Sequence, residues 1–503
     1  MQRPGVTRRK FLKTSGAVAV TTILPPRWAR AAAMDPFVEL DATEQAALVR
    51  RKEVQPIELV DAAIHRIEAL NPQLNSFVTT CFERARQTAR GALPDGPFRG
   101  VPYAIKDLSD FEGVRMTMGS RLFADNVADE NNGIVQRALA TGVVVLGKTN
   151  TPEFGLLPST ESLLLGPTRN PWNLAHSPGG SSGGAAAAVA AGILPFAQAS
   201  DGGGSIRIPA SCCGVFGLKP SRGRIFRTSK PLPGDISVRF AVSRSVRDSA
   251  TMLAASELAG ATAPLPAVGV VAGPAKRRLR IAFTDKIGKA AAADPEVSAA
   301  LRDVAHLCER LGHRVVEAAP AVDGDEFTQR FLALWASIPA QVAAYAWLIG
   351  LRQLRLVTAS DVLEPWTLGL ARWLEQRGGE TVSRAVEYCK QVERTFAAFF
   401  ADHDVLLTPV LASAPVPIGV LAPDVDFERL LERVTRYAAY TPPFNAAGLP
   451  AMSVPLSWSA DGLPIGSQFA TRIGGERTLL ELAYELEQER PWARRWPSVS
   501  AAG

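Results

Sequence analysis

The sequence predicts an α/β fold built around a central β-sheet. Short apolar runs bounded by glycine alternate with stretches of helical periodicity, and this alternation is typical of a sheet covered by helices. The 503 residues contain 47% hydrophobic and 21% charged residues, which is enough apolar surface to bury a sizeable core. There is no internal repeat and no linker long enough to mark an independent second domain.

The first elements are expected between residues 41 and 146. Apolar residues recur at three- and four-residue steps from Asp41 to Leu70, so this stretch is predicted to be helical, with an interruption at Pro56. The apolar run 101–105 predicts a short buried strand that ends at Lys106, and the run 142–146 predicts a second strand.

Two loops, a helix and a strand follow in the middle of the chain. Residues 177–184 predict a loop, the alanine-rich run 185–191 a helix, 194–199 a strand, and 201–204 a tight turn. Residues 320–440 are mostly helical in pattern and are expected to form the substrate-pocket region. Strand patterns return at 405–408 and 452–456, and an amphipathic helix is expected at 477–489.

The N-terminus has the order of an export signal. Arg8, Arg9 and Lys10 stand in a segment that resembles the twin-arginine signal, an apolar stretch follows at 16–24, and Ala31 begins a run of small residues. The apolar stretch is about half the ~20 residues that a membrane span needs. We therefore expect a signal peptide at 1–33, a single large domain at 34–495 and a tail at 496–503. No other segment is predicted to span a membrane. The mature protein is expected to be periplasmic or secreted.

Charge and cysteine content exclude several classes of protein. The net charge is +6, but residues 1–34 hold seven basic and no acidic residues, so the rest of the chain is nearly neutral and offers no polyanion-binding surface. Five cysteines in so long a chain are not a disulfide framework, and none has metal-ligand spacing. The five histidines are scattered, which disfavours a metal hydrolase; we expect no metal and no cofactor.

Two glycine-rich loops carry the chemical interpretation. Gly179–Gly184 and Asp201–Pro209 could simply be flexible, and neither has the pattern of a phosphate-binding loop. However, Ser205 follows three glycines, whose amides can approach a ligand closely. That arrangement suits a nucleophile beside an oxyanion hole in acyl transfer.

These loops, with five further motifs, resemble the amidase signature family. The motifs are Lys106-Asp107, Lys148–Gly155, Arg169–Asn173, Phe216–Pro220 and Phe444–Ala451, and the resemblance runs from about residue 36 to 490. It implies a central twisted mixed β-sheet surrounded by α-helices in a single large domain.

The resemblance also implies the roles of individual residues. Ser205 is expected to be the nucleophile, Ser181 a bridging serine that follows a cis peptide bond at Gly180, and Lys106 the base. The amides of Gly202, Gly203, Gly204 and Ser205 are expected to form the oxyanion hole, with Asp201, Arg207 and Ser182 supporting the site from behind.

A lysine base requires a neutral amine. Burial at the end of an apolar strand lowers a lysine pKa, which suits Lys106. Asp107 would oppose neutrality if it faced the same way, but alternation along a strand sends it to the other side.

Several cysteine, histidine and tryptophan residues are expected to have structural roles and no part in catalysis. Cys212 and Cys213 are expected in the core, and His176 is expected to be a loop residue without a catalytic role. The tryptophans of 320–440, at positions 335, 347, 366 and 373, are expected mainly in the core, with one or two lining the pocket.

The function predicted from these patterns is hydrolysis of small or medium organic amides, linear, cyclic or aryl, through an acyl-enzyme on Ser205. Within the family the chain looks most like hydrolases of 6-aminohexanoate cyclic dimer. The alternatives left open are the glutaminase-type A subunit of a tRNA-dependent amidotransferase, which the export signal argues against, and a non-catalytic binding protein, which retention of the triad residue types argues against. The expected partner is a small-molecule amide, with no nucleic acid and no membrane span in the mature protein. The sequence leaves open whether the protein forms a homodimer.

Overall fold

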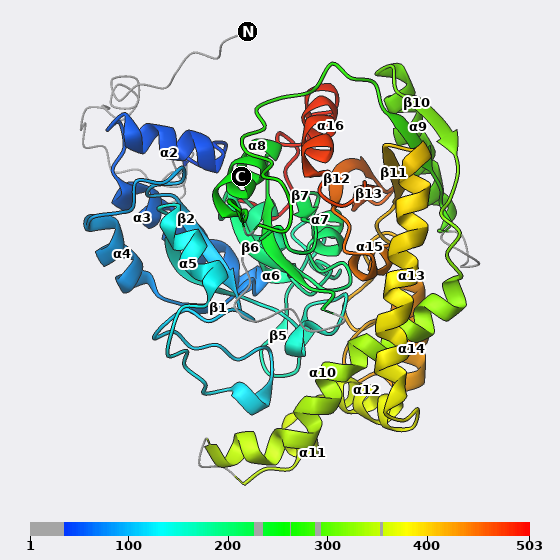
Figure 1. The fold of residues 1–503 in the computed structure, drawn as a ribbon. Coiled ribbons are helices and arrows are strands. Elements are labelled where there is room, and N and C mark those ends of the chain that lie inside the picture. Colours follow the sequence, from blue (N-terminus) through cyan, green and yellow to red (C-terminus); the bar gives the residue numbers. More distant parts are fainter. Residues whose placement is uncertain (1–34, 226–234, 262, 287–292, 353–355, 503) are drawn as a thin grey trace, which may run out of the picture.

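An eight-stranded mixed sheet runs through the centre of the computed structural model of the protein, with helices around it (Figure 1). Two neighbouring strand pairs, β10–β9 and β9–β11, are parallel and the others are antiparallel. In spatial order the strands are β10 (Arg314–Glu317), β9 (Arg280–Phe283), β11 (Val405–Pro409), β13 (Pro464–Ala470), β12 (Ala451–Trp458), β7 (Phe216–Lys219), β8 (Val238–Ser243) and β6 (Phe196–Asp201). The α/β prediction with a central mixed sheet is confirmed.

The structure describes residues 35–225, 235–261, 263–286, 293–352 and 356–502. The signal peptide predicted at residues 1–33 therefore lies outside the described residues, and so does Gly503 of the predicted tail.

The strand that carries Lys106 belongs to a separate three-stranded sheet. Its strands are β1 (Phe77–Thr80), β3 (Val144–Thr149) and β2 (Pro102–Lys106), in that order. This sheet is joined to the large one at the strand end, where the Lys106 amide donates to Oε1 of Gln198 on β6 at 2.8 Å. The contact brings the end of β2 next to β6, which leads into the loop between β6 and α7. A two-stranded ladder, β4 (Glu161–Ser162) with β5 (Gly166–Pro167), lies nearby in the chain.

Helices from both halves of the chain cover the sheets, and their ends follow local sequence signals. Pro56 does not simply interrupt a helix: it starts a second one, where its missing N–H costs nothing. α6 consists of glycine, alanine and valine and is buried throughout, because small side chains let it pack close to its neighbours. The elements outside 320–450 are α2 (Ala42–Arg50), α3 (Pro56–Leu74), α4 (Phe82–Arg90), α5 (Gly133–Ala140), α6 (Gly183–Ala190), α7 (Arg207–Cys213), α8 (Val246–Ser256), α9 (Pro295–Arg310), α16 (Glu476–Glu489) and the 3₁₀ turns η1 (Arg121–Phe123) and η2 (Glu153–Gly155).

The region predicted to be mostly helical, residues 320–440, is helical over most of its length, and together with the short helix that follows it lies beside one end of the sheet (Figure 1). The helices are α10 (Gly324–Arg352), α11 (Ala359–Val362), α12 (Pro365–Glu375), α13 (Glu380–Asp402), α14 (Phe427–Tyr437) and α15 (Pro442–Ala446).

Helix α10 corrects one expectation. From the sequence, no segment beyond the N-terminus was expected to be long and apolar enough to span a membrane. By length and composition α10 is, since it has 29 residues and an 18-residue window of mean hydropathy 1.5. The reason is that no charged residue stands between Arg330 and Arg352. One third of that window, 33%, is buried within the protein, and the helix packs against α12 and α13.

Candidate active site

Lys106 ends strand β2 with its side chain fully buried among serine hydroxyls. Its Nζ atom lies 2.7 Å from Oγ of Ser181, 2.9 Å from Oγ of Ser182 and 3.1 Å from Oγ of Ser200. A neutral amine has two N–H donors and one lone pair. Two of the three hydroxyls can therefore accept from the amine while the third donates to its lone pair.

The hydrogen bonds around Ser182 decide part of this arrangement. The Ser182 hydroxyl donates to the carbonyl oxygen of Ser200 at 3.2 Å, so its remaining role toward Lys106 is that of acceptor. If Ser200 accepts the second N–H, the lone pair of Lys106 points at Ser181. This is the orientation in which Lys106 can take a proton from Ser181.

The surroundings of Lys106 favour its neutral form. Burial lowers the pKa of Lys106 well below its ordinary value; Asp201 opposes this shift and Arg239 adds to it. Asp107 faces away, as expected from strand alternation, because its Oδ1 atom lies 3.4 Å from Nζ of Lys148. The buried strand end thus keeps the nearest carboxylate in the sequence away from the base.

Ser181 is held on a loop with little free space. The expected cis peptide bond is present between Gly180 and Ser181. Gly155 packs against this serine with φ +72°, and a Cβ atom at that position would lie 2.9 Å from Oγ of Ser181. Only glycine fits there without displacing the hydroxyl.

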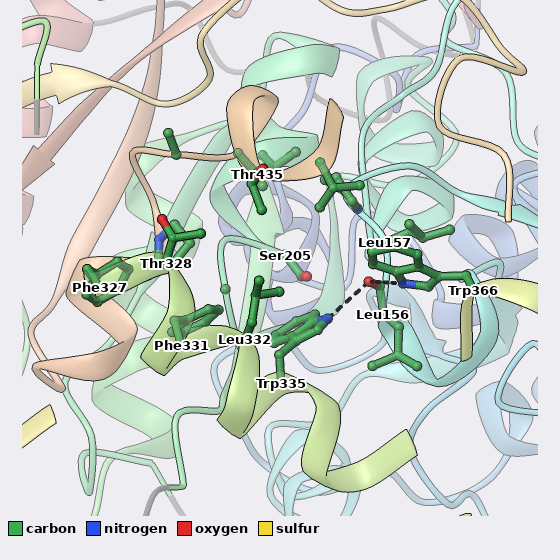
Figure 2. Close-up of a pocket in the computed structure, with 17 residues that line it drawn as sticks. Leu156, Leu157, Ser205, Phe327, Thr328, Phe331, Leu332, Trp335, Trp366 and Thr435 are labelled. Atoms are coloured by element: carbon green, nitrogen blue, oxygen red, sulfur yellow. Dashed lines mark hydrogen bonds between the residues drawn. The ribbon is translucent and has the colours of Figure 1, made fainter. Parts of the chain in front are cut away.

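Ser205 stands between strand β6 and helix α7 and is 6% exposed, on the wall of a pocket (Figure 2). The carboxylate of Asp201 organises the loop before it, accepting from the amides of Gly204 at 2.8 Å and Ile206 at 3.2 Å. The loop that carries Ser205 and the loop that carries Ser181 are tied together, since the Cys213 thiol donates to the carbonyl oxygen of Pro178.

This hydrogen bonding engages one of the four amides that were expected to form the oxyanion hole. The amide of Gly204 is already donated to Asp201, so it is not available to a substrate oxygen. Within the described residues no acceptor takes the amides of Gly202, Gly203 or Ser205. These three remain as candidate oxyanion donors.

Asp201 and Arg207 pair behind the loop, as predicted. Nε and Nη2 of Arg207 donate to the two carboxylate oxygens of Asp201 at 2.9 and 2.8 Å, and both side chains are fully buried. Although burial acts to raise the pKa of Asp201, Arg207 lowers it overall. The remaining three guanidinium hydrogens are accepted by Gln468, Asn445 and the carbonyl oxygen of Thr441, so the loop is anchored to β13 and to α15 and its start.

The pocket beside Ser205 has a volume of about 680 Å³ including its opening to solvent. Two of the predicted tryptophans, Trp335 and Trp366, contribute to its wall, and their indole nitrogens both donate to the carbonyl oxygen of Leu156 at 3.2 Å (Figure 2). Of the other two tryptophans, Trp373 is in the core and Trp347 is 56% exposed. The wall comprises Leu156, Leu157, Pro158, Gly203, Ser205, Ile208, Phe327, Thr328, Phe331, Leu332, Trp335, Trp366, Val434, Thr435, Ala438, Ala439 and Pro442.

The remaining candidates have the ordinary places expected for them. Cys212 is buried, and burial raises its pKa to about 12, so its thiolate is not populated near neutral pH. Cys213 is likewise buried. His176 lies in a loop that pairs with Pro417, away from the pocket wall. Among the described residues no group of three or more His, Cys, Asp or Glu side chains could hold a metal ion.

Comparison with known proteins places this geometry in a family. A sequence profile described as Amidase matches residues 58–480, which is most of the chain. The chain belongs to the amidase signature family. It is 38% identical over 497 residues to a 6-aminohexanoate-cyclic-dimer hydrolase of Pseudomonas sp. (strain NK87), covering 91% of this chain and 96% of that protein. It is 36% identical over 481 residues to an acylamidase of Rhodococcus erythropolis, covering 92% and 98%.

A solved structure supports the same assignment. A 6-aminohexanoate cyclic dimer hydrolase superposes with a TM-score of 0.83 at 34% identity, over 92% of this chain and 99% of that one. This amidase is therefore a hydrolase of carboxylic amide bonds. The relatives support that activity over the amidotransferase alternative.

One residue in contact with Lys106 was not among those expected from the sequence. Ser200 supplies the third hydroxyl around Lys106, five residues before Ser205. A serine at a strand end is common, and nothing in the spacing distinguishes it. Its proximity to Lys106 depends on β2 and β6 lying side by side.

Proposed function

We propose that this amidase works through an acyl-enzyme on Ser205, with Ser181 and Lys106 as its proton relay. The observation that carries the proposal is the buried Lys106 amine, which lies 2.7 Å from the Ser181 hydroxyl and makes no ion pair with a carboxylate of the described residues. Ser205 attacks the amide carbonyl carbon, its proton passes to Ser181, and the proton of Ser181 passes to Lys106. The carbonyl oxygen, now negative, is stabilised by the free amides of the glycine loop.

The second half of the reaction uses the same relay in reverse. The C–N bond breaks as Lys106 returns its proton through Ser181 to the leaving nitrogen, which departs as an amine. Water then attacks the ester carbon of acylated Ser205. The relay accepts the proton of that water and restores the serine hydroxyl as the carboxylic acid leaves.

The test of this proposal is covalent labelling. A fluorophosphonate probe is expected to label the protein at Ser205, as mapped by mass spectrometry, and to leave Ser205→Ala unlabelled and without measurable amide hydrolysis. Ser383→Ala, which changes an exposed serine on α13, is the matched control and should label like the wild type. Labelling of active protein at any other residue would contradict the assignment of the nucleophile.

We also propose that the substrates are small or medium organic amides and that the protein is exported to the periplasm or beyond. The named activities of its relatives, one on a cyclic amide and one an acylamidase, support the first point. The twin-arginine-like segment around Arg8 and Arg9 supports the second.

A further inference from the structure

The wall of the pocket beside Ser205 carries no charge. None of its 17 residues, all in the described part of the chain, is Asp, Glu, Lys, Arg or His. The few polar side chains on it are already engaged. The hydroxyl of Thr328 donates to the carbonyl oxygen of Gly324 at 2.8 Å, and that of Thr435 donates to the carbonyl oxygen of Leu431 at 2.8 Å.

The two indoles are engaged in the same way. Both N–H groups are donated to the carbonyl oxygen of Leu156, so Trp335 and Trp366 present ring surface to the pocket rather than hydrogen-bond donors (Figure 2). Apart from Ser205 and its loop amides, the pocket thus has little to offer an ionic or strongly polar group. A charged group entering it would lose its hydration without gaining a partner.

One side of the pocket is a row of aromatic rings on helix α10. Phe327, Phe331 and Trp335 follow one another at four-residue spacing, which places them on one face of the helix. Their rings stack, with centroids 5.6 Å apart at 23° for the first pair and 5.8 Å apart at 25° for the second.

The aromatic row reaches the catalytic loop. A Cβ atom added at Gly203 would lie 3.2 Å from Cζ3 of Trp335 and 3.4 Å from Cζ of Phe331. The rings therefore lie against a loop whose amide is a candidate oxyanion donor. A substrate carbonyl bound there would have its neighbouring atoms on the ring faces.

The direction of the proton relay decides which half of the substrate lies on the rings. The leaving nitrogen must face Ser181 to receive a proton, and neither Ser181 nor Lys106 belongs to the pocket wall. The group that extends into the pocket is therefore the one on the other side of the carbonyl carbon, the acyl group.

We infer that this amidase selects amides whose acyl group is uncharged and apolar, preferably with a flat aromatic ring, and rejects those whose acyl group carries a charge. The inference rests on the proposed role of Ser205. Its substrate class is aryl-alkanoyl and medium-chain alkanoyl amides. It disfavours glutamine, whose acyl part carries an ammonium and a carboxylate.

A matched pair of substrates tests the inference. Heptanamide and 6-aminohexanamide have acyl chains of the same length, and at neutral pH the second ends in an ammonium group in place of a methyl group. Because the pocket provides no counter-charge, we expect kcat/KM for 6-aminohexanamide to be lower by about 100-fold or more, and for glutamine as low or lower. We expect phenylacetamide to be turned over at least as well as heptanamide.

Two variants locate the selectivity in the pocket. Trp335→Leu should lower kcat/KM for phenylacetamide by about 10-fold or more relative to its effect on kcat/KM for acetamide, because acetamide does not reach the rings. The control is Trp347→Leu, which alters an exposed tryptophan on the same helix and should leave both values unchanged.

Thr435→Glu should raise the ratio of 6-aminohexanamide to heptanamide turnover by about 10-fold or more by supplying a carboxylate. Thr395→Glu, at a helical threonine on α13 outside the pocket, should not change the ratio.

The outcomes separate this inference from the proposed catalytic mechanism. Equal turnover of heptanamide and 6-aminohexanamide by protein that is labelled at Ser205 would overturn the inference and leave the mechanism standing. A Trp335→Leu effect that is the same for acetamide and phenylacetamide would also overturn it, since the ring would then act on the loop and not on the acyl group. Active protein that the fluorophosphonate probe labels elsewhere would instead overturn the mechanism.

Discussion

In the proposed relay Lys106 must be neutral to accept a proton, and this requirement predicts that the activity depends on pH. Burial lowers the pKa of Lys106 well below its ordinary value of 10.5, so the amine loses its proton at a lower pH than an exposed lysine does. Below that pKa the relay is blocked by an ammonium group that has no lone pair. We expect kcat/KM to rise with pH and to level off once Lys106 is neutral.

Two variants assign this pH dependence to Lys106. Lys106→Ala is expected to lose most activity, by about 10³-fold, and its residual rate should lose the rising limb. Lys390→Arg, a change at an exposed lysine paired with Glu387, should keep the wild-type profile. A wild-type kcat/KM without a rising limb at any pH at which the protein stays folded would count against a lysine base.

Site residues that belong to distinctive motifs could be identified from the sequence. Site residues whose contacts depend on packing could not. Lys106, Ser181 and Ser205 stand in motifs specific enough to be recognised far apart in the chain. Ser200 reaches Lys106 only because β2 and β6 meet, and the amide of Gly204 is occupied only because the Asp201 carboxylate turns back toward it. Neither contact can be inferred from the spacing of residues in the sequence.

At the scale of elements, strands were predicted where apolar runs are continuous. β11 and β12 begin within a residue of their predicted positions. The sequence analysis did not predict β8 or β13, because Arg239 interrupts the first and glycine, serine and glutamine dilute the second. Their pairing with neighbours that were predicted fixes them as strands.

A pair of buried carboxyl groups near the start of α12 makes stability depend on pH. The Glu364 carboxyl accepts from the amide of Leu163, while the Glu364 amide donates to Oε2 of Glu153 at 2.9 Å. Burial first, and then the charge of Glu153, raise the pKa of Glu364 from 4.5 to about 8. The folded protein therefore binds more protons than the unfolded chain between these values, so this group's contribution to the free energy of unfolding falls as the pH rises through that range.

Glu364→Gln tests this linkage. The amide cannot ionise, so the variant should lose less stability than the wild type between about pH 5 and 8, by up to about 1.4 kcal/mol per pH unit. The melting temperatures of both proteins at the two pH values give the difference directly. Asp248 and Glu487 also have raised pKa values, but they are present in both proteins and cancel. Parallel pH dependence in the two proteins would show that Glu364 does not carry this titration.

At the scale of the whole molecule, the central sheet ties the site to almost the full chain. Strands from β6 to β13 share one sheet, and the network around Arg207 joins residues as far apart as 201 and 468. Cutting the chain within this region would separate the catalytic loop from its supports. This is why the absence of a long linker in the sequence was a sound indication of one domain.

The whole molecule also folds without disulfides, which bears on the route of export. All five cysteines are free, three of them buried. A protein that needs no disulfide can complete its fold before any export step. This agrees with the twin-arginine-like segment, a type of signal associated with passengers that fold first.

Export is tested by changing the two arginines. We expect the full chain, made in a bacterium with a twin-arginine pathway, to reach the periplasm, and Arg8→Lys/Arg9→Lys to remain in the cytoplasm as active amidase. Cell fractionation followed by an amide hydrolysis assay measures both location and folding. Arg27→Lys, a change in the same segment outside the arginine pair, is the matched control and should still be exported. Equal export of the double variant would assign the segment to another pathway, whereas cytoplasmic wild-type protein would remove the case for a signal altogether.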